Sequence, residues 1–99
     1  MMNSENIVNF IKNKQHCILF VLDSNHFSSK LLKLRVNNLQ VDEPFRFVEL
    51  DSIKYYAQYY DLVVVPSVLF FKNGNLVGKV RGILSSEDLQ QIIKFYKEK

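Results

Sequence analysis

Sulfur is scarce in this sequence of 99 residues, which holds one cysteine, Cys17, and two methionines. A single cysteine excludes a disulfide within the chain. It also excludes any mechanism in which two thiols of the same chain cycle through a disulfide. Chains without disulfides are typical of reducing compartments, and we therefore expect a cytoplasmic protein.

Other features are missing as well, and each one excludes a class of protein. No apolar run approaches the roughly 18 residues that cross a membrane, and the N-terminus lacks the basic segment and apolar core of a secretory signal. With 13 basic and 10 acidic side chains, no block of five like charges and a net charge of +3, nucleic-acid binding is not expected. We expect no membrane partner either.

Metal-binding residues are too few and too poorly spaced for a site. His16 and Cys17 are adjacent, so on a strand their side chains point to opposite faces. His26 has no second histidine or cysteine nearby. The sequence therefore predicts no metal and no cofactor, and it predicts that Cys17 is a small buried hydrophobic residue.

What the chain does contain is enough apolar material for one domain, residues 1–99. Hydrophobic residues make up 47% of it and charged residues 23%, which is ordinary for a globular protein. Ninety-nine residues leave no room for a second domain. No internal repeats or linkers are visible.

Apolar periodicity predicts four helices. The first runs from Ser4 to Lys14, and the second from Ser28 to Leu39. Asp51 or Ser52 begins the third, with Ile53, Tyr56, Ala57 and Tyr60 on its inner face. Ser85 and Asp88 form a capping box at the start of the last, whose apolar stripe is Leu89, Ile92, Ile93 and Tyr96.

Four strands alternate with these helices. The uninterrupted apolar run Cys17–Leu22 predicts a strand buried on both faces, and Phe45–Leu50 predicts a second. Ser67–Phe71 and Leu76–Val80 flank Asn73-Gly74, a pair that favours a hairpin turn. The order α-β-α-β-α-β-β-α predicts an α/β fold with a four-stranded mixed sheet and helices on both faces.

The segment VPSVLFFKNGNLVGKVRGILSSEDLQQII, residues 65–93, resembles the C-terminal half of thioredoxin. The shared features are Val65-Pro66, an apolar strand that runs into Phe71-Lys72-Asn73-Gly74, and Gly82-Ile83-Leu84-Ser85 before the last helix. The resemblance implies a thioredoxin-like fold whose N-terminal strand is absent or very short. It also implies a cis peptide bond before Pro66, with the backbone of Val65 turned outward.

The turn before the second helix departs from the family. Thioredoxins carry Trp-Cys-Gly-Pro-Cys-Lys there, and aligning on Lys30 places His26 and Ser29 at the two cysteines, with Phe27-Ser28 between them. Neither histidine nor serine can form or resolve a disulfide. The family's buried acid and its lysine partner fall on Phe20 and Phe47. The resemblance, taken with the missing CxxC motif, therefore predicts a thioredoxin-like protein with no dithiol redox activity. His26 and Ser29 are the vestigial positions of the two catalytic cysteines.

The resemblance implies a groove between this turn and Pro66, and we expect the chain to use it as a binding module. We assign no catalytic residue. The expected partner is a protein or an extended peptide, and Phe27 is expected to be exposed as an apolar anchor unless it packs back on the second helix. The candidate binding residues are Asn25, His26, Phe27, Ser28, Ser29, Val65, Pro66, Arg81 and Gly82.

Two other interpretations stay open. In the first, Ser29 or His26 handles a small thiol such as glutathione in an atypical enzyme, whereas the simpler alternative is that Ser28 or Ser29 is the helix N-cap. In the second, the chain is a subunit of a larger complex.

Overall fold

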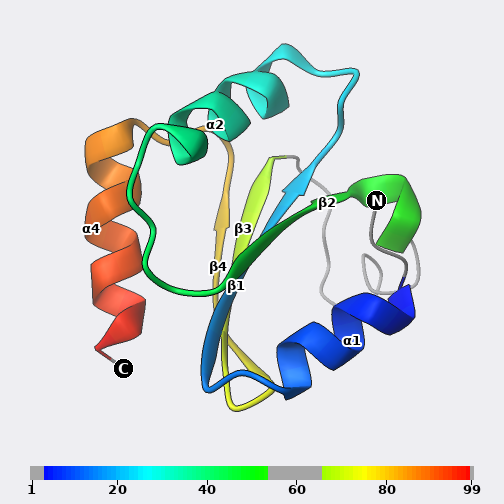
Figure 1. Cartoon of the computed structure of the whole chain (residues 1–99). Helices are drawn as coiled ribbons and strands as arrows, with labels where there is room; N and C mark the ends of the chain where they lie inside the picture. Colours follow the sequence, from blue (N-terminus) through cyan, green and yellow to red (C-terminus); the bar gives the residue numbers. More distant parts are fainter. Residues whose placement is uncertain (1–3, 54–65, 99) are drawn as a thin grey trace.

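The computed structural model describes residues 4–53 and 66–98, and side chains from Ile7 onward within them. Its elements follow the predicted order (Figure 1). They are α1 (Ser4–Lys12), β1 (His16–Leu22), α2 (Phe27–Asn37), β2 (Phe45–Glu49), the 3-10 helix η1 (Leu50–Ile53), β3 (Ser67–Lys72), β4 (Asn75–Arg81) and α4 (Ser86–Lys97).

The four strands form one mixed sheet in the order β2-β1-β3-β4. The strand β1 runs parallel to β2 and antiparallel to β3, and β3 runs antiparallel to β4. The parallel pairing of the first two strands and the final antiparallel hairpin are both as predicted. In the hairpin turn Asn73 has φ 52° and Gly74 φ 84°, the positive values that asparagine and glycine tolerate.

Helices cover both faces of the sheet, as expected (Figure 1). Alternate residues of β1 point to opposite faces: Cys17, Leu19 and Val21 join the cluster under α1. The intervening residues, Ile18, Phe20 and Leu22, join the cluster under α2 and α4. Because both faces are buried, β1 needs an uninterrupted apolar sequence.

The third predicted helix is described only at its start. Residues Leu50–Ile53 form the short 3-10 helix η1, in which Ile53 is buried. Asp51 and Ser52 lie inside this turn rather than before it, and the Ser52 hydroxyl donates to the carbonyl of Glu49 at 2.8 Å. Tyr56, Ala57 and Tyr60, the rest of the predicted inner face, lie outside the described residues.

The last helix has the predicted cap and stripe. The Ser85 hydroxyl accepts the Asp88 N–H at 3.1 Å, and Leu89 and Ile93 are buried. Tyr96 stacks on Phe70 of β3, with ring centroids 4.4 Å apart. Phe70 pairs with Gly78 on β4, so the Tyr96 ring lies over a residue that has no side chain.

A Cβ atom added at Gly78 would collide with the Tyr96 ring. We expect Gly78→Ala to lower the free energy of unfolding by about 1 kcal/mol or more, because the ring must leave its stack on Phe70. Urea denaturation measures this. In a Tyr96→Ala background the same substitution should cost almost nothing, and an equal cost in both backgrounds would show that the ring is not responsible.

Candidate functional site

Three separate parts of the chain meet at one end of the sheet. The last residues of β1 pair with the first of β3, Val21 opposite Ser67, and Ser67 pairs with Arg81 at the end of β4. The Gly82 N–H then donates to the carbonyl of Pro66 at 2.8 Å. The turn after β1, Pro66 and Gly82 therefore lie at the same sheet end, which we call the tip end.

The structure describes most of the predicted residues at the tip end. Pro66 is buried and Gly82 adopts a left-handed φ of 86°. Ile83, directly after Gly82, is 42% exposed. Ile83 is not among the predicted binding residues, and its place in the loop directly after Gly82 is the available signal for an exposed contact. Val65 and its bond to Pro66 lie outside the described residues, so the cis prediction stays a prediction.

Asp23 organises the turn that carries the predicted residues. Its carboxylate accepts the Asn25 N–H at 3.0 Å, and its carbonyl accepts the His26 N–H at 2.9 Å. The His26 Nε2 lies 3.4 Å from an Asp23 carboxylate oxygen. Because the two side chains are 58% and 29% exposed, this contact orients the imidazole more than it stabilises the fold.

A second carboxylate ties this turn to the neighbouring strand. Glu49, the last residue of β2, accepts the Ser24 N–H at 3.0 Å. The sequence predicts only a polar turn from Asp23 to Phe27, and the signal for this Asx turn is Asp23 itself, whose side chain can accept the backbone N–H two residues later. The Glu49 contact spans 25 residues, and no local pattern predicts it.

The start of α2 corrects the predicted cap. The N-cap is His26, with extended φ and ψ of −106° and 132°, and its side chain caps nothing. Ser28 and Ser29 lie within the helix, so neither is the N-cap. The Ser29 hydroxyl instead accepts the Asp23 N–H at 3.0 Å. Its acceptor oxygen therefore caps the preceding turn.

The position of Ser29 also bears on ligand binding. Ser29 is only 1% exposed, whereas Asn25, His26 and Phe27 are exposed and Ser28 is half-buried. A buried hydroxyl that already accepts a backbone N–H is poorly placed to meet a ligand. Its burial weighs against Ser29 as a thiol-contacting residue and favours a structural role.

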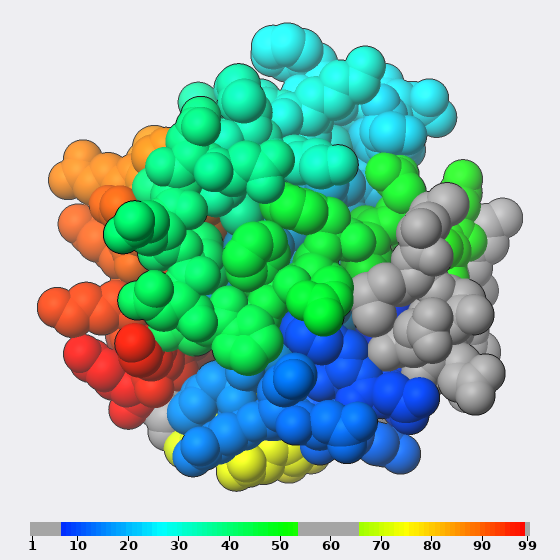
Figure 2. All heavy atoms as spheres, in the orientation of Figure 1, coloured from blue at the N-terminus to red at the C-terminus, as the bar shows by residue number. Residues whose placement is uncertain are grey.

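Phe27 is exposed, as predicted. It is 77% exposed, the largest value among the exposed large hydrophobic side chains of the described residues. The alternative, in which the ring packs back on α2, is therefore wrong. Figure 2 shows the turn and the first part of α2 projecting from the body of the molecule.

Phenyl rings occupy the two positions at which the resemblance to thioredoxin implies a buried acid and a lysine. Phe20 is fully buried, and its ring centroid lies 5.5 Å from that of Phe47 and 5.7 Å from that of Phe45. The predicted use of Phe20 and Phe47 in core packing is confirmed. No proton acceptor stands at either position.

Cys17 lies near the other end of β1 and is 2% exposed. Burial raises the pKa of its thiol to about 11, an effect that the nearby Lys14 ammonium partly offsets. The prediction of a buried hydrophobic cysteine is confirmed. Within residues 4–53 and 66–98, no group of three His, Cys, Asp or Glu side chains is placed to hold a metal ion.

Comparison with known proteins identifies the fold. The chain matches no protein-family model and no curated protein. Solved thioredoxin structures superimpose on nearly all of it. A mutant thioredoxin from Halobacterium salinarum matches 97% of this chain and 87% of its own with a TM-score of 0.86 and 18% identity.

Two further thioredoxins agree. The oxidised thioredoxin from Plasmodium falciparum covers 95% of this chain and 92% of its own, with a TM-score of 0.83 and 16% identity. Mitochondrial thioredoxin 3 from Saccharomyces cerevisiae covers 96% and 92%, with a TM-score of 0.78 and 21% identity. The predicted thioredoxin-like fold is therefore confirmed. None of the described helices is long and apolar enough to span a bilayer.

The structural role of Ser29 can be tested by a matched pair of substitutions. We expect Ser29→Ala to lower the free energy of unfolding by about 1–2 kcal/mol, because the part-buried Asp23 N–H loses its acceptor. Ser28→Ala, one residue away, should change it by less than about 0.5 kcal/mol. Chemical denaturation measures both, and equal costs would contradict the assigned role.

The raised pKa of Cys17 makes a prediction about alkaline pH. The folded thiol loses its proton near 11 and the unfolded thiol near its ordinary value of 9.0. The stabilisation from the buried neutral thiol is thus complete below pH 9 and is lost as the pH rises towards 11. The difference in unfolding free energy between wild type and Cys17→Ala should shift against the wild type over this interval. A constant difference would show that the thiol does not titrate as assigned.

Proposed function

We propose that this thioredoxin-fold chain binds a protein or an extended peptide at the tip end and performs no dithiol redox chemistry. The proposed binding surface is formed by Asn25, His26, Phe27 and Arg81 to Ile83, and the resemblance adds the backbone of Val65 before the buried Pro66. The observation that carries the proposal is the 77% exposure of Phe27 at the sheet end that also holds Gly82 and the exposed Ile83.

An exposed phenylalanine in this position is best explained by a partner. Leaving a large aromatic side chain in water forfeits roughly 1.5–3 kcal/mol of burial energy, and aromatic residues are enriched among the side chains that dominate binding. Around Phe27 lie exposed polar groups, His26 and Asn25. An apolar centre with a polar rim is the usual composition of a protein interface.

The absence of dithiol chemistry is supported by three observations. The chain has one cysteine, which is buried near the opposite end of β1 from the tip. The residues aligned with the two thioredoxin cysteines are His26 and Ser29. Phe20 and Phe47 occupy the places of the acid and lysine, and both pack in the core. The chain therefore has no second thiol with which Cys17 could form an internal disulfide.

Two parts of the proposal rest on the resemblance and the composition. A cis bond before Pro66 would turn the Val65 backbone outward, so that its N–H and C=O could pair with an extended peptide. The single cysteine supports a reducing compartment such as the cytoplasm. A permanent place as a subunit of a larger complex would use the same apolar surface.

Two assays distinguish a binding module from a thiol-handling enzyme. Retention on immobilised glutathione would favour the enzyme and the use of His26 or Ser29. Reduction of insulin disulfides at the rate of an active thioredoxin would overturn the redox-inactive part of the proposal. We expect neither.

The anchor role of Phe27 is tested with peptides selected from a random dodecapeptide library on the wild-type chain. We expect Phe27→Ala to weaken their binding at least about tenfold, because the ring is the largest exposed apolar contact. Fluorescence anisotropy measures the affinity, and circular dichroism verifies folding.

The control is Phe95→Ala, the same change at a 53% exposed phenylalanine on α4. It should leave the affinity unchanged. A library that yields no binder, or binders that tolerate Phe27→Ala as well as Phe95→Ala, would contradict the proposed surface.

A further inference from the structure

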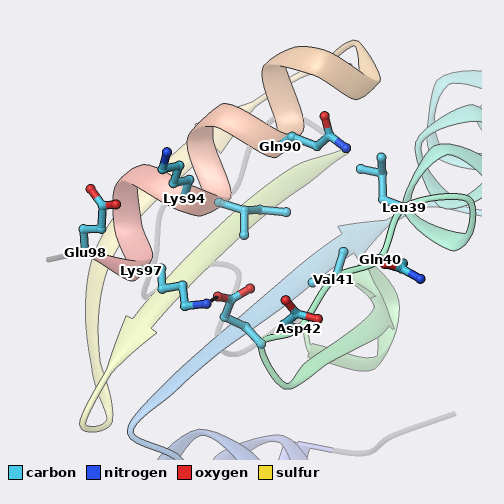
Figure 3. A pocket seen from close by; sticks show the side chains of 10 residues that line it. Leu39, Gln40, Val41, Asp42, Gln90, Lys94, Lys97 and Glu98 are labelled. Carbon is cyan, nitrogen blue, oxygen red and sulfur yellow. Dashed lines mark ion pairs between the residues drawn. The ribbon is translucent and has the colours of Figure 1, made fainter.

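A hollow lies away from the tip end, between α4 and the segment that leads into β2. Its volume is about 510 Å³, within the range of ligand sites. Leu39, Val41 and Ile93 supply apolar lining, and Gln90 lies at its α4 side. In Figure 3 α4 forms one wall and the stretch from Leu39 to Asp42 forms the other, with the Gln90 side chain directed towards Leu39.

A neighbouring hollow of about 330 Å³ lies near the start of β1. Asp42, Glu43 and Lys97 line both hollows, which we together call the groove. The Lys97 ammonium reaches from α4 to the Glu43 carboxylate at 3.3 Å. Because the two linings follow the segment from Leu39 to Pro44 in order, a ligand that occupies both hollows is an extended chain and not a compact small molecule.

The segment wall offers backbone groups. Gln40, Val41 and Asp42 belong to no helix or strand, and their N–H and C=O groups make no hydrogen bond with the rest of the described residues. Such a stretch can pair with an incoming extended peptide in the manner of an added strand. At the far end of the groove, His16 Nε2 is buried and has no partner among the described residues.

The charges that line the groove indicate what kind of peptide fits. The groove as a whole is balanced, since its lining holds three carboxylates, of Asp42, Glu43 and Glu98, and three ammonium groups, of Lys14, Lys94 and Lys97. A preference for one charge therefore depends on which of these groups is unpaired. Glu43 is only 10% exposed and is paired with Lys97. The exposed Asp42 carboxylate, beside Val41, has no such partner within the described part of the chain.

We infer that this groove is a second peptide site, which binds an extended segment carrying an apolar side chain next to a basic one. The apolar side chain lies on Leu39, Val41 and Ile93, and the basic one meets Asp42. The peptide backbone pairs with residues 40–42. This site is independent of the proposed function, because it lies at the end of the sheet where β1 and β2 begin, opposite the tip end.

The experiment titrates isotope-labelled wild-type chain with the acetylated, amidated hexapeptide Gly-Ser-Leu-Arg-Ser-Gly and follows backbone amide shifts by NMR. We expect saturable shifts in residues 39–43 and along α4 from Gln90 to Lys97. Changing the peptide's leucine to serine, or its arginine to glutamate, should each weaken binding about fivefold.

Two matched pairs of chain variants locate the site. Gln90→Arg should weaken hexapeptide binding about fivefold, because the longer side chain obstructs the groove and repels the arginine of the peptide, whereas Gln91→Arg should not. Asp42→Lys should weaken it by a similar factor, whereas Asp51→Lys, the same change on η1, should not. All four positions are exposed, so their effects are read on folded chains.

Each other outcome overturns the inference. Shifts confined to the tip end and abolished by Phe27→Ala would mean that the peptide uses only the first surface. Equal effects within each matched pair would mean general electrostatics. In a third outcome, phenethylamine produces the same shifts and displaces the hexapeptide completely, and the substitutions of the peptide's leucine and arginine do not change its affinity. The groove would then bind small cationic amphiphiles and not a peptide.

Discussion

The burial of β1 on both faces is the constraint on which the rest of this structure depends. The strand lies between β2 and β3, with α1 over one face and α2 and α4 over the other. Every side chain from Cys17 to Leu22 is buried, so the strand cannot slip in register without exposing one apolar set. Its two ends therefore have fixed surroundings: the turn that begins at Asp23 at one, and the groove beside His16 at the other.

At and beneath the tip end, three residues that stand where the resemblance implies redox residues stabilise the fold instead. Ser29 caps the preceding turn, and Phe20 and Phe47 pack in a cluster of rings. What remains exposed is a phenylalanine at the start of α2, beside a loop that presents Ile83. Apolar side chains are therefore exposed at the sheet end where the resemblance to thioredoxin implies two cysteines, and this chain has His26 and Ser29 at those positions.

The two proposed surfaces lie at opposite ends of β1, so occupancy of one does not block the other. A chain with two peptide sites can hold two segments at once, or two parts of one partner. Linked binding of this kind raises the effective concentration of the second segment. Such an arrangement would suit the proposed binding module, because one chain could then bring two segments together.

Periodicity and composition alone determined the element order, the mixed sheet, the hairpin at Asn73-Gly74, the cap at Ser85 and the burial of Cys17, because each depends on neighbours in the chain. The count of one cysteine settled the absence of an internal dithiol. Only the tertiary structure decided that His26 is the N-cap, that Ser29 is buried and that Glu49 holds Ser24. These depend on how the turn at Asp23 and the start of α2 pack against the domain, and the contact between Ser24 and Glu49 joins residues 25 positions apart. The groove likewise exists only because α4 packs beside residues 39–43, some 50 positions earlier in the chain, a separation that no local pattern encodes.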